Sequence, residues 1–301
     1  MKGKSFLEKI RSSLGKINTW RFFILFSAFV VIIGNPFVNY KWDINFIQGW
    51  FQSFGIGNLW IVSPLEGLET ILTAKFLYTA TIVGMVVPVL LAFLLGRVFC
   101  SWLCPIEFLS NLTDRVLGFL SKKLRYRKDL ITLPRRIIWF VLITELLITL
   151  IIGYPMFVWW SPPGLVGREA MFYAFYKVIT IEIVIVVAVL FFNLLTRRFF
   201  CRYFCPLGAT LALIGKKRQL VIKYDKDKCI NCKACDTKCP MGIKPSIGES
   251  QSVYCWNCAE CVDTCPTKAL SFTWNDDGII KLKVHNSLTS MKNTDKLITT
   301  K

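Results

Sequence analysis

Twelve cysteines lie in four tight groups along the chain, and a proline directly follows the last cysteine of each group. Two groups read Cys-x-x-x-Cys-Pro, and two read Cys-x-x-Cys-x-x-Cys-x-x-x-Cys-Pro. Secreted proteins rich in disulfides are short and lack long apolar segments, whereas this chain has 301 residues, of which 54% are apolar. The grouping therefore indicates thiolates that bind metal rather than scattered disulfide bridges.

The two longer groups have the spacing of the ligands to a pair of 4Fe–4S clusters. Three thiolates separated by two residues curl around one cluster, and the fourth thiolate reaches across to the other cluster. One cluster is then expected at Cys229, Cys232, Cys235 and Cys265. The other is expected at Cys255, Cys258, Cys261 and Cys239. Zinc is the alternative metal, although zinc sites usually combine two separated pairs of ligands.

Residues 220–275 resemble the two-cluster ferredoxin domain of bacterial type, because all eight cysteines of that ligand pattern are present. The resemblance implies an α+β domain with two 4Fe–4S clusters. Two clusters placed side by side indicate transport of single electrons rather than chemistry on a substrate.

The two shorter groups contain Cys100 with Cys104 and Cys201 with Cys205. On a helix the two thiols of each pair would lie on one face, at positions i and i+4. If the pairs meet, four thiolates could hold a further metal centre, such as a third iron–sulfur cluster, or act as redox dithiols. The alternative is that these thiols only pack at helix ends. Pro105 and Pro206 are expected to break or bend the chain just after each pair.

Four segments are apolar over nearly the length that a bilayer crossing needs, about 20 residues. They are residues 20–38, 76–96, 137–154 and 178–196. Lys and Arg concentrate before the first segment, between the second and third, and after the fourth, which predicts that both termini are cytoplasmic. All twelve cysteines then lie on the reducing side of a bacterial inner membrane, which again disfavours disulfides. The net charge of +18 is explained in the same way, and no nucleic-acid-binding motif is present.

The two halves of the apolar region repeat each other. Ser63-Pro64 precedes the first Cys-x-x-x-Cys-Pro group, and Ser161-Pro162 precedes the second. Each half therefore reads span, outer loop with Ser-Pro, span, Arg, Phe and the cysteine pair. Residues 44–72, which belong to the first outer loop, are expected to form an interfacial or lumenal loop.

The predicted fold is an α-helical membrane protein with four transmembrane helices in two pseudo-repeated hairpins, followed by an α+β ferredoxin domain. Residues 1–19 form a basic cytoplasmic N-terminus, and 20–215 form the transmembrane domain with both Cys-x-x-x-Cys-Pro motifs. The ferredoxin domain covers 216–275, and a polar tail covers 276–301.

This combination of spans, Cys-x-x-x-Cys-Pro motifs and ferredoxin module resembles the NapH-type membrane quinol dehydrogenases of the polyferredoxin superfamily. The superfamily also contains NosR-like and CcoG-like proteins, which carry extra domains. The resemblance implies a protein that takes electrons from the quinone pool in the lipid and delivers them to a partner iron–sulfur or cytochrome subunit. A redox-sensing or metal-reducing maturation protein of the same superfamily is the alternative.

Acids inside the apolar segments are candidates for handling the protons of a quinol. Glu145 lies nearer mid-span than Glu182, so it is the better candidate for a proton relay, and pairing with a neighbouring span is the alternative for both. The outer-loop acids Glu66, Glu69 and Glu169 are expected to be solvated or to help release protons. The only histidine, His285, lies outside the spans, which excludes a haem b held by two histidines within this chain.

Overall fold

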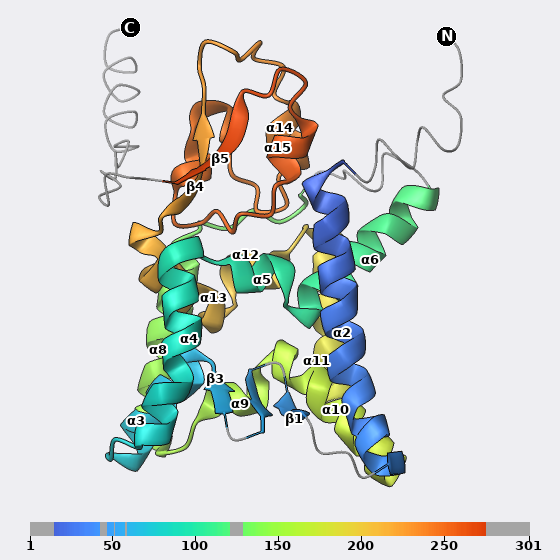
Figure 1. Ribbon diagram of the computed structural model, residues 1–301, viewed down its shortest axis with the longest axis vertical. Helices are drawn as coiled ribbons and strands as arrows, with labels where there is room; N and C mark the ends of the chain where they lie inside the picture. Colours follow the sequence, from blue (N-terminus) through green and yellow to red (C-terminus); the bar gives the residue numbers. More distant parts are fainter. Residues whose placement is uncertain (1–14, 43–46, 51, 58, 121–128, 275–301) are drawn as a thin grey trace, which may run out of the picture.

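The computed structural model describes residues 15–42, 47–50, 52–57, 59–120 and 129–274. The predicted polar tail with His285 and most of the predicted basic N-terminus lie outside these ranges. A helical part occupies residues 17–217, and a smaller part with short strands and helices covers one end of it (Figure 1).

The helical part consists of two halves with nearly the same order of elements. The first half contains α2 (Ile17–Trp42), β1 (Ile47–Trp50), β2 (Ser53–Ile56), β3 (Leu59–Val62), α3 (Pro64–Ala74), α4 (Thr79–Leu95), α5 (Val98–Trp102) and α6 (Pro105–Leu120). The second half contains α8 (Ile137–Ile152), α9 (Met156–Trp160), α10 (Pro162–Tyr176), α11 (Ile183–Leu195), α12 (Phe199–Tyr203) and α13 (Pro206–Ile214). The predicted repeat is thus present in the order of the helices.

The Ser-Pro pair of each half begins a helix rather than sitting in a loop. Ser63 is the N-cap of α3, where its Oγ accepts a hydrogen bond from the backbone N of Glu66 at 3.3 Å. Ser161 occupies the N-cap position of α10. In both halves the following proline is the first helical residue, a position at which its missing N–H is not needed.

The halves are interlocked, because each outer helix packs against the first helix of the other half. Helix α10 contacts α2, and its counterpart α3 contacts α8. The helices that follow the cysteine pairs lie against both halves: α6 contacts α2 and α11, and α13 contacts α8 and α4. Figure 1 shows the short helices α5, α12 and α13 lying between the long ones.

Helix length distinguishes the four predicted spans. Among the described residues, only α2, with 26 residues, is both long and apolar enough to cross a bilayer. The other three predicted spans correspond to α4, α8 and α11, which are apolar but have 17, 16 and 13 residues. A full crossing of the hydrocarbon core takes about 20 residues, so these three helices are short for that task.

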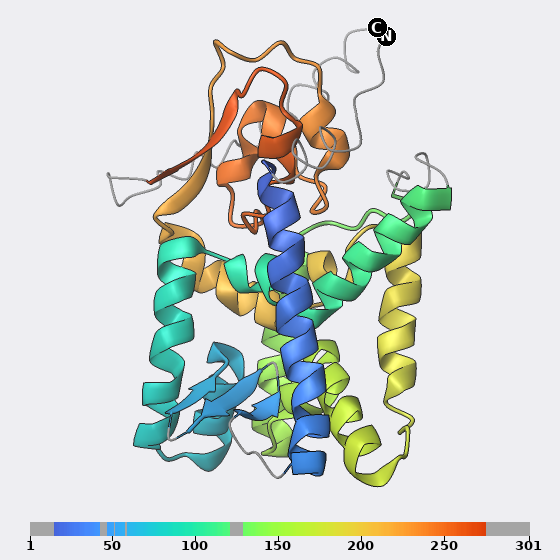
Figure 2. The ribbon, with the colours of Figure 1, turned by 45° about the vertical axis from the view of Figure 1, so that its right-hand side comes forward.

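The prediction of a loop at residues 44–72 is wrong for most of that stretch. Strands β1, β2 and β3 form an antiparallel sheet, with Ile47 opposite Ile56 and Ser53 opposite Val62. Gly57 has a positive φ of 59° in the tight connection between β2 and β3, a conformation that glycine adopts without strain. Strand β3 packs on α4 (Figure 2), so the sheet closes one side of the helical part.

The smaller part contains β4 (Leu220–Tyr224), α14 (Ala234–Lys238), η2 (Pro245–Ile247), η3 (Glu249–Gln251), α15 (Glu260–Thr264) and β5 (Leu270–Trp274). Strands β4 and β5 pair antiparallel, with Leu220 opposite Trp274. The carboxylate of Asp263 accepts hydrogen bonds from the first backbone N–H groups of α2, at Ile17 (3.2 Å) and Asn18 (2.6 Å). A negative charge at a helix N-terminus is favourable, so this contact joins the two parts.

Candidate functional site

The first cysteine set predicted to bind a cluster surrounds a cavity near the surface of the small part. Cys229, Cys232, Cys235 and Cys265 all line it, and its empty volume is about 350 Å³. Asn231 and Lys233 have positive φ angles of 53° and 54°, which let the short loop between the thiols wrap around the space. Because Cys232 is exposed, we name this the exposed ferredoxin cavity.

The second predicted set surrounds a neighbouring cavity of about 290 Å³, which we name the buried ferredoxin cavity. Its four cysteines are only 5–6% exposed. They are Cys239, Cys255, Cys258 and Cys261. Helices α14 and α15 pack against each other, and the cysteine that follows each helix reaches the cavity of the other run. The structure therefore brings together each of the two sets of four that the spacing predicts.

Burial sets the protonation state of the thiols around the buried ferredoxin cavity. Burial raises the pKa of Cys239 to about 11, and it raises the pKa values of Cys258 and Cys261 further. Without metal these groups keep their protons at neutral pH, whereas metal ligation requires thiolates. The chemistry of the donor set therefore fits iron–sulfur clusters, which replace the protons.

The third set, Cys100, Cys104, Cys201 and Cys205, also meets around one cavity, of about 370 Å³. We name it the bundle cavity. The expectation that each pair lies on one helix is wrong. Cys100 and Cys201 belong to α5 and α12, but Cys104 and Cys205 come after these helices end. The reason is the proline, which begins a new helix immediately after each second thiol.

The size of the three cavities bears on which metal they could hold. Among the described residues, no three His, Cys, Asp or Glu side chains are gathered closely enough to hold a single metal ion. The thiols instead surround spaces of about 290–370 Å³, and the bundle cavity is as large as the two ferredoxin cavities. Each of these spaces is therefore bordered by four thiols, the donor set that a 4Fe–4S cluster takes.

One buried cation lines the bundle cavity. Arg97 is 1% exposed, and its Nη2 donates a long hydrogen bond, 3.5 Å, to the carbonyl of Cys201. Its Nε and Nη1 have no partner among the residues that the structure describes. The guanidinium lies within electrostatic reach of Cys100 and Cys205. A buried charge normally needs compensation, so this position suits an anionic group in the cavity.

The bundle cavity and the buried ferredoxin cavity are joined by direct contacts. The hydroxyl of Ser101 donates to the carbonyl of Trp256 at 2.6 Å, and the indole of Trp102 donates to the carbonyl of Asn257 at 3.2 Å. Trp256 is 1% exposed and lines the buried ferredoxin cavity. Cysteines of all three sets belong to, or pack against, one hydrophobic core, so the cavities form a continuous series.

The predicted acids have varied surroundings. Glu145 of α8 has an unpartnered Oε1, and its charge interacts with that of Glu69 on α3. Glu69 is fully buried and accepts a hydrogen bond from the backbone N of Phe157 at 3.1 Å, so the expectation that it is solvated is wrong. Glu182 forms an ion pair of 2.6 Å with Arg168. Glu169 is buried and accepts from the backbone N of Thr180 at 3.1 Å.

Sequence reasoning missed three residues that matter to these sites, namely Arg97, Glu107 and Trp256. The sequence shows an arginine two residues before each Phe-Cys pair, at Arg97 and Arg198, but it does not show which groups surround each arginine. Glu107 is fully buried, two residues after Cys-Pro, and pairs with Arg21 at 3.0 Å and with Arg198. Trp256 lies between the predicted ligands Cys255 and Cys258, and this position could have identified it as a residue next to the cluster.

Comparison with known proteins gives a consistent assignment. The family described as "4Fe-4S binding domain" matches residues 77–127 and 178–223, which contain the two Cys-x-x-x-Cys-Pro groups. A Methanocaldococcus jannaschii protein, MJ0749, is 34% identical over 196 residues, which cover 64% of this chain and 71% of that protein. No solved structure matches the chain.

Two similar proteins carry functional names. The ferredoxin-type protein NapH of Escherichia coli is 29% identical over 227 residues, covering 71% of this chain and 75% of NapH. The methylamine utilization ferredoxin-type protein MauN of Methylobacillus flagellatus is 29% identical over 191 residues, covering 63% of this chain and 64% of MauN.

Proposed function

The chain belongs to the polyferredoxin family of 4Fe–4S electron-transport proteins, and on this premise we propose that it is a membrane-embedded quinol dehydrogenase component. It takes electrons from quinol in the lipid and delivers them singly to a partner redox protein. The observation that carries this proposal is the series of three cavities, each lined by four cysteines, from the helical part to the exposed end of the ferredoxin domain.

We further propose that α2, α4, α8 and α11 all lie in the membrane. Their outward-facing side chains support this, because large apolar residues are exposed on every one of them. Examples are Phe23 at 52%, Val83 at 57%, Ile151 at 83% and Val184 at 59%. A soluble protein rarely exposes so continuous an apolar surface, whereas lipid covers it without cost. The charge bias then places the ferredoxin domain in the cytoplasm.

The bundle cavity is proposed to hold a third 4Fe–4S cluster, ligated by Cys100, Cys104, Cys201 and Cys205. Two observations support it: the guanidinium of Arg97 beside the thiols, whose Nε and Nη1 have no partner among the described residues, and the match of a 4Fe-4S family to both halves. When bound, each cluster would supply a one-electron redox centre. The protein's part is to bury the thiolates, to keep water away and to compensate their charge.

The burial of the cavities suggests where electrons leave. The buried ferredoxin cavity adjoins the helical part through Trp256, whereas the exposed ferredoxin cavity opens to solvent at Cys232. A partner protein can approach only the second of these closely. The exposed ferredoxin cavity is therefore the proposed point of transfer to the partner.

A direct test is the replacement of all four bundle cysteines by serine in the full-length protein. The protein should lose the iron of one of its three proposed clusters. Quinol should no longer reduce the two ferredoxin clusters. The two ferredoxin EPR signals should remain after reduction by dithionite, because their ligands are untouched. Unchanged iron content with unchanged quinol-driven reduction would contradict the proposal of a third cluster.

A further inference from the structure

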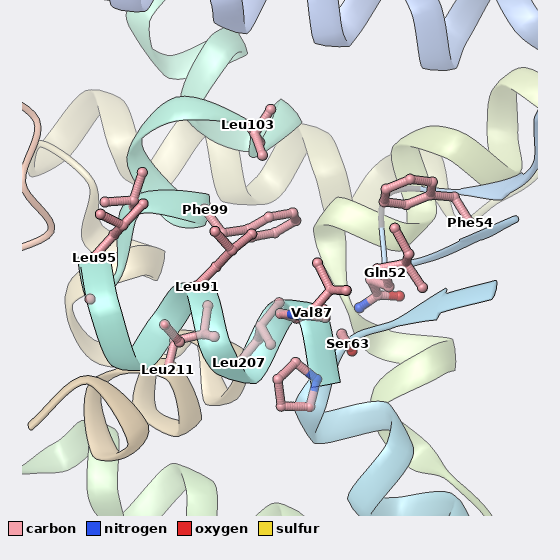
Figure 3. A pocket seen from close by; sticks show the side chains of 16 residues that line it. Gln52, Phe54, Ser63, Val87, Leu91, Leu95, Phe99, Leu103, Leu207 and Leu211 are labelled. Atoms are coloured by element: carbon pink, nitrogen blue, oxygen red, sulfur yellow. The ribbon is translucent and has the colours of Figure 1, made fainter. Parts of the chain in front are cut away.

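An apolar cavity adjoins the bundle cavity. It has an empty volume of about 800 Å³ and is lined by residues of β2, β3, α4, α5 and α13 and by Gln52 and Ser63. Figure 3 shows leucine and phenylalanine side chains of α4, α5 and α13 converging on it. We propose that this apolar cavity binds the quinol head group, which deepens the proposed function and rests on it.

Proximity to the thiols is the first argument. Two side chains, Phe99 and Leu207, line both the apolar cavity and the bundle cavity. Phe99 directly precedes Cys100, and Leu207 follows Cys205 by two residues. A ring bound at this end of the apolar cavity would contact side chains that also border the four thiols. Because electron tunnelling weakens steeply with distance, such a neighbour is well placed to give up electrons.

Polarity is the second argument, since a quinol needs an apolar pocket with a few hydrogen-bonding groups. Gln52 lines the cavity and is 2% exposed. Its Nε2 donates to the hydroxyl of Ser161, but its Oε1 is buried without a partner. The oxygen lies against Gly164 of α10, so the amide group would have to turn to accept a hydrogen bond from a quinol hydroxyl, and a buried amide without a partner for its oxygen gains from doing so.

Access from lipid is the third argument. Several lining residues on one side are partly exposed, including Val87 at 41%, Leu91 at 49% and Leu103 at 39%. On α4 they are flanked by the exposed apolar side chains of Val86 and Leu90. The mouth of the cavity therefore opens onto the surface that the proposed function assigns to lipid, so that an isoprenoid tail could stay outside.

Oxidation of the bound quinol breaks its two O–H bonds, forms two C=O bonds and releases two electrons and two protons. The electrons leave one at a time toward the neighbouring thiol cavity. The proposed acceptors of the protons lie on α3, beyond Ser63 and Pro64 at its start, which line the cavity. Glu66 and Glu69 each have a buried carboxylate oxygen without a partner, and burial raises the pKa of both to about 7. They can therefore accept and release protons near neutral pH.

The test uses binding as its main readout, so that it does not depend on loaded clusters. Full-length protein in lipid nanodiscs is labelled with an azido-ubiquinone, and the labelled peptides are mapped by mass spectrometry. Label is expected on peptides of β2, α4 or α5, with competition by decyl-ubiquinone but not by added phospholipid. Label elsewhere, or equal competition by phospholipid, would overturn the assignment.

Two variants with matched controls sharpen the test. Leu91→Trp fills the mouth and should reduce labelling about tenfold, whereas Leu90→Trp, on the neighbouring exposed position, should not. Gln52→Leu removes the unpartnered oxygen and should weaken labelling about fivefold, whereas Gln48→Leu on the exposed side of β1 should leave it unchanged. Full labelling of both Leu91→Trp and Gln52→Leu would contradict the inference.

The proposed function is tested separately by mixing decyl-ubiquinol or menadiol with the iron-loaded wild type. If quinols bleach the cluster absorbance in wild type and in Leu91→Trp at equal rates, the function stands and the cavity assignment fails. If dithionite reduces the clusters but no quinol does, the proposed function fails, whatever the labelling shows.

Discussion

The two Cys-x-x-x-Cys-Pro segments repeat each other in sequence, yet the arginine before each one has opposite surroundings. Arg198, in the second half, forms ion pairs with Glu107 and Asp114. Arg97, its counterpart in the first half, is equally buried but keeps two nitrogens without partners among the described residues. One arginine is neutralised by the protein, and the other faces the bundle cavity.

The residue three positions after the second cysteine explains the difference. The first half has Glu107 there, which pairs with Arg198, and the second half has Gly208. A Cβ added to Gly208 would come within 2.6 Å of Nη2 of Arg97, so the absence of a side chain makes room for the guanidinium. The repeat thus provides two equivalent arginine positions: one forms ion pairs within the protein, and the other borders the cavity of the proposed third cluster.

The largest effect is expected from Glu107→Gln, which removes the compensating charge from Arg198 and Arg21. Breaking a buried ion pair on one side costs about 3–5 kcal/mol, so the free energy of unfolding should fall by that amount. Thermal unfolding in detergent measures it. Glu249→Gln is the matched control, because its pair with Arg135 is partly exposed at 3.4 Å and contributes about 0–1 kcal/mol. Equal effects of the two variants would show that Glu107 is not the structural partner described here.

A smaller effect of opposite character is expected from Arg97→Met. Loss of a positive charge beside the bundle thiols should lower the reduction potential of the proposed centre by roughly 50–100 mV, from Coulomb's law at an effective dielectric constant of about 20. EPR-monitored redox titration measures it, with Lys217→Met at an exposed position as the control.

The same pair of arginines can be compared in the iron-free protein. Arg97→Met should leave its thermal stability unchanged or raise it, since an uncompensated buried charge is removed. Arg198→Met should lower it, because Glu107 then loses a partner. If both variants lowered the thermal stability to the same degree, the two arginines would not differ in whether the protein compensates their charge.

The smallest effect is expected from Gly208→Ala. The added methyl group displaces the guanidinium of Arg97 while its charge is kept. The potential should shift in the same direction as in Arg97→Met but by less, and the free energy of unfolding should change by no more than about 1 kcal/mol. Gly34→Ala, where no atom lies within 4 Å of the added carbon, is the control and should shift nothing.

Local spacing explains what the sequence could predict. The ligand sets of the ferredoxin domain depend on short loops, so the positions of Cys229 and Cys255 already indicated which thiols would meet. The helical repeat was visible because hydropathy and the Ser-Pro pairs recur at nearly the same distance. Pro105 and Pro206 also indicated a break in the chain near each pair, although α5 and α12 end before the second thiol and a new helix begins at each proline.

Long-range packing explains what the sequence could not predict. Whether Arg97 or Arg198 meets a carboxylate depends on how α6 and α13 cross the opposite half. The apolar cavity is formed by elements from both halves, and its sheet arises in a stretch whose polar residues favoured a loop. Gln52 belongs to the stretch that was expected to form a loop, but it is buried next to the β2–β3 pair and in contact with Ser161.

The exchange of outer helices has a consequence for how such a chain could have arisen. Helix α3 packs on α8 as well as on α4, and α10 packs on α2 as well as on α11, so a polypeptide with one half alone would expose the face of its outer helix that packs on the other half. A half-length ancestor would have been complete only as a pair of identical copies, with two thiols contributed by each. Gene duplication and fusion would then have freed the two copies to diverge, as the glycine opposite Glu107 illustrates.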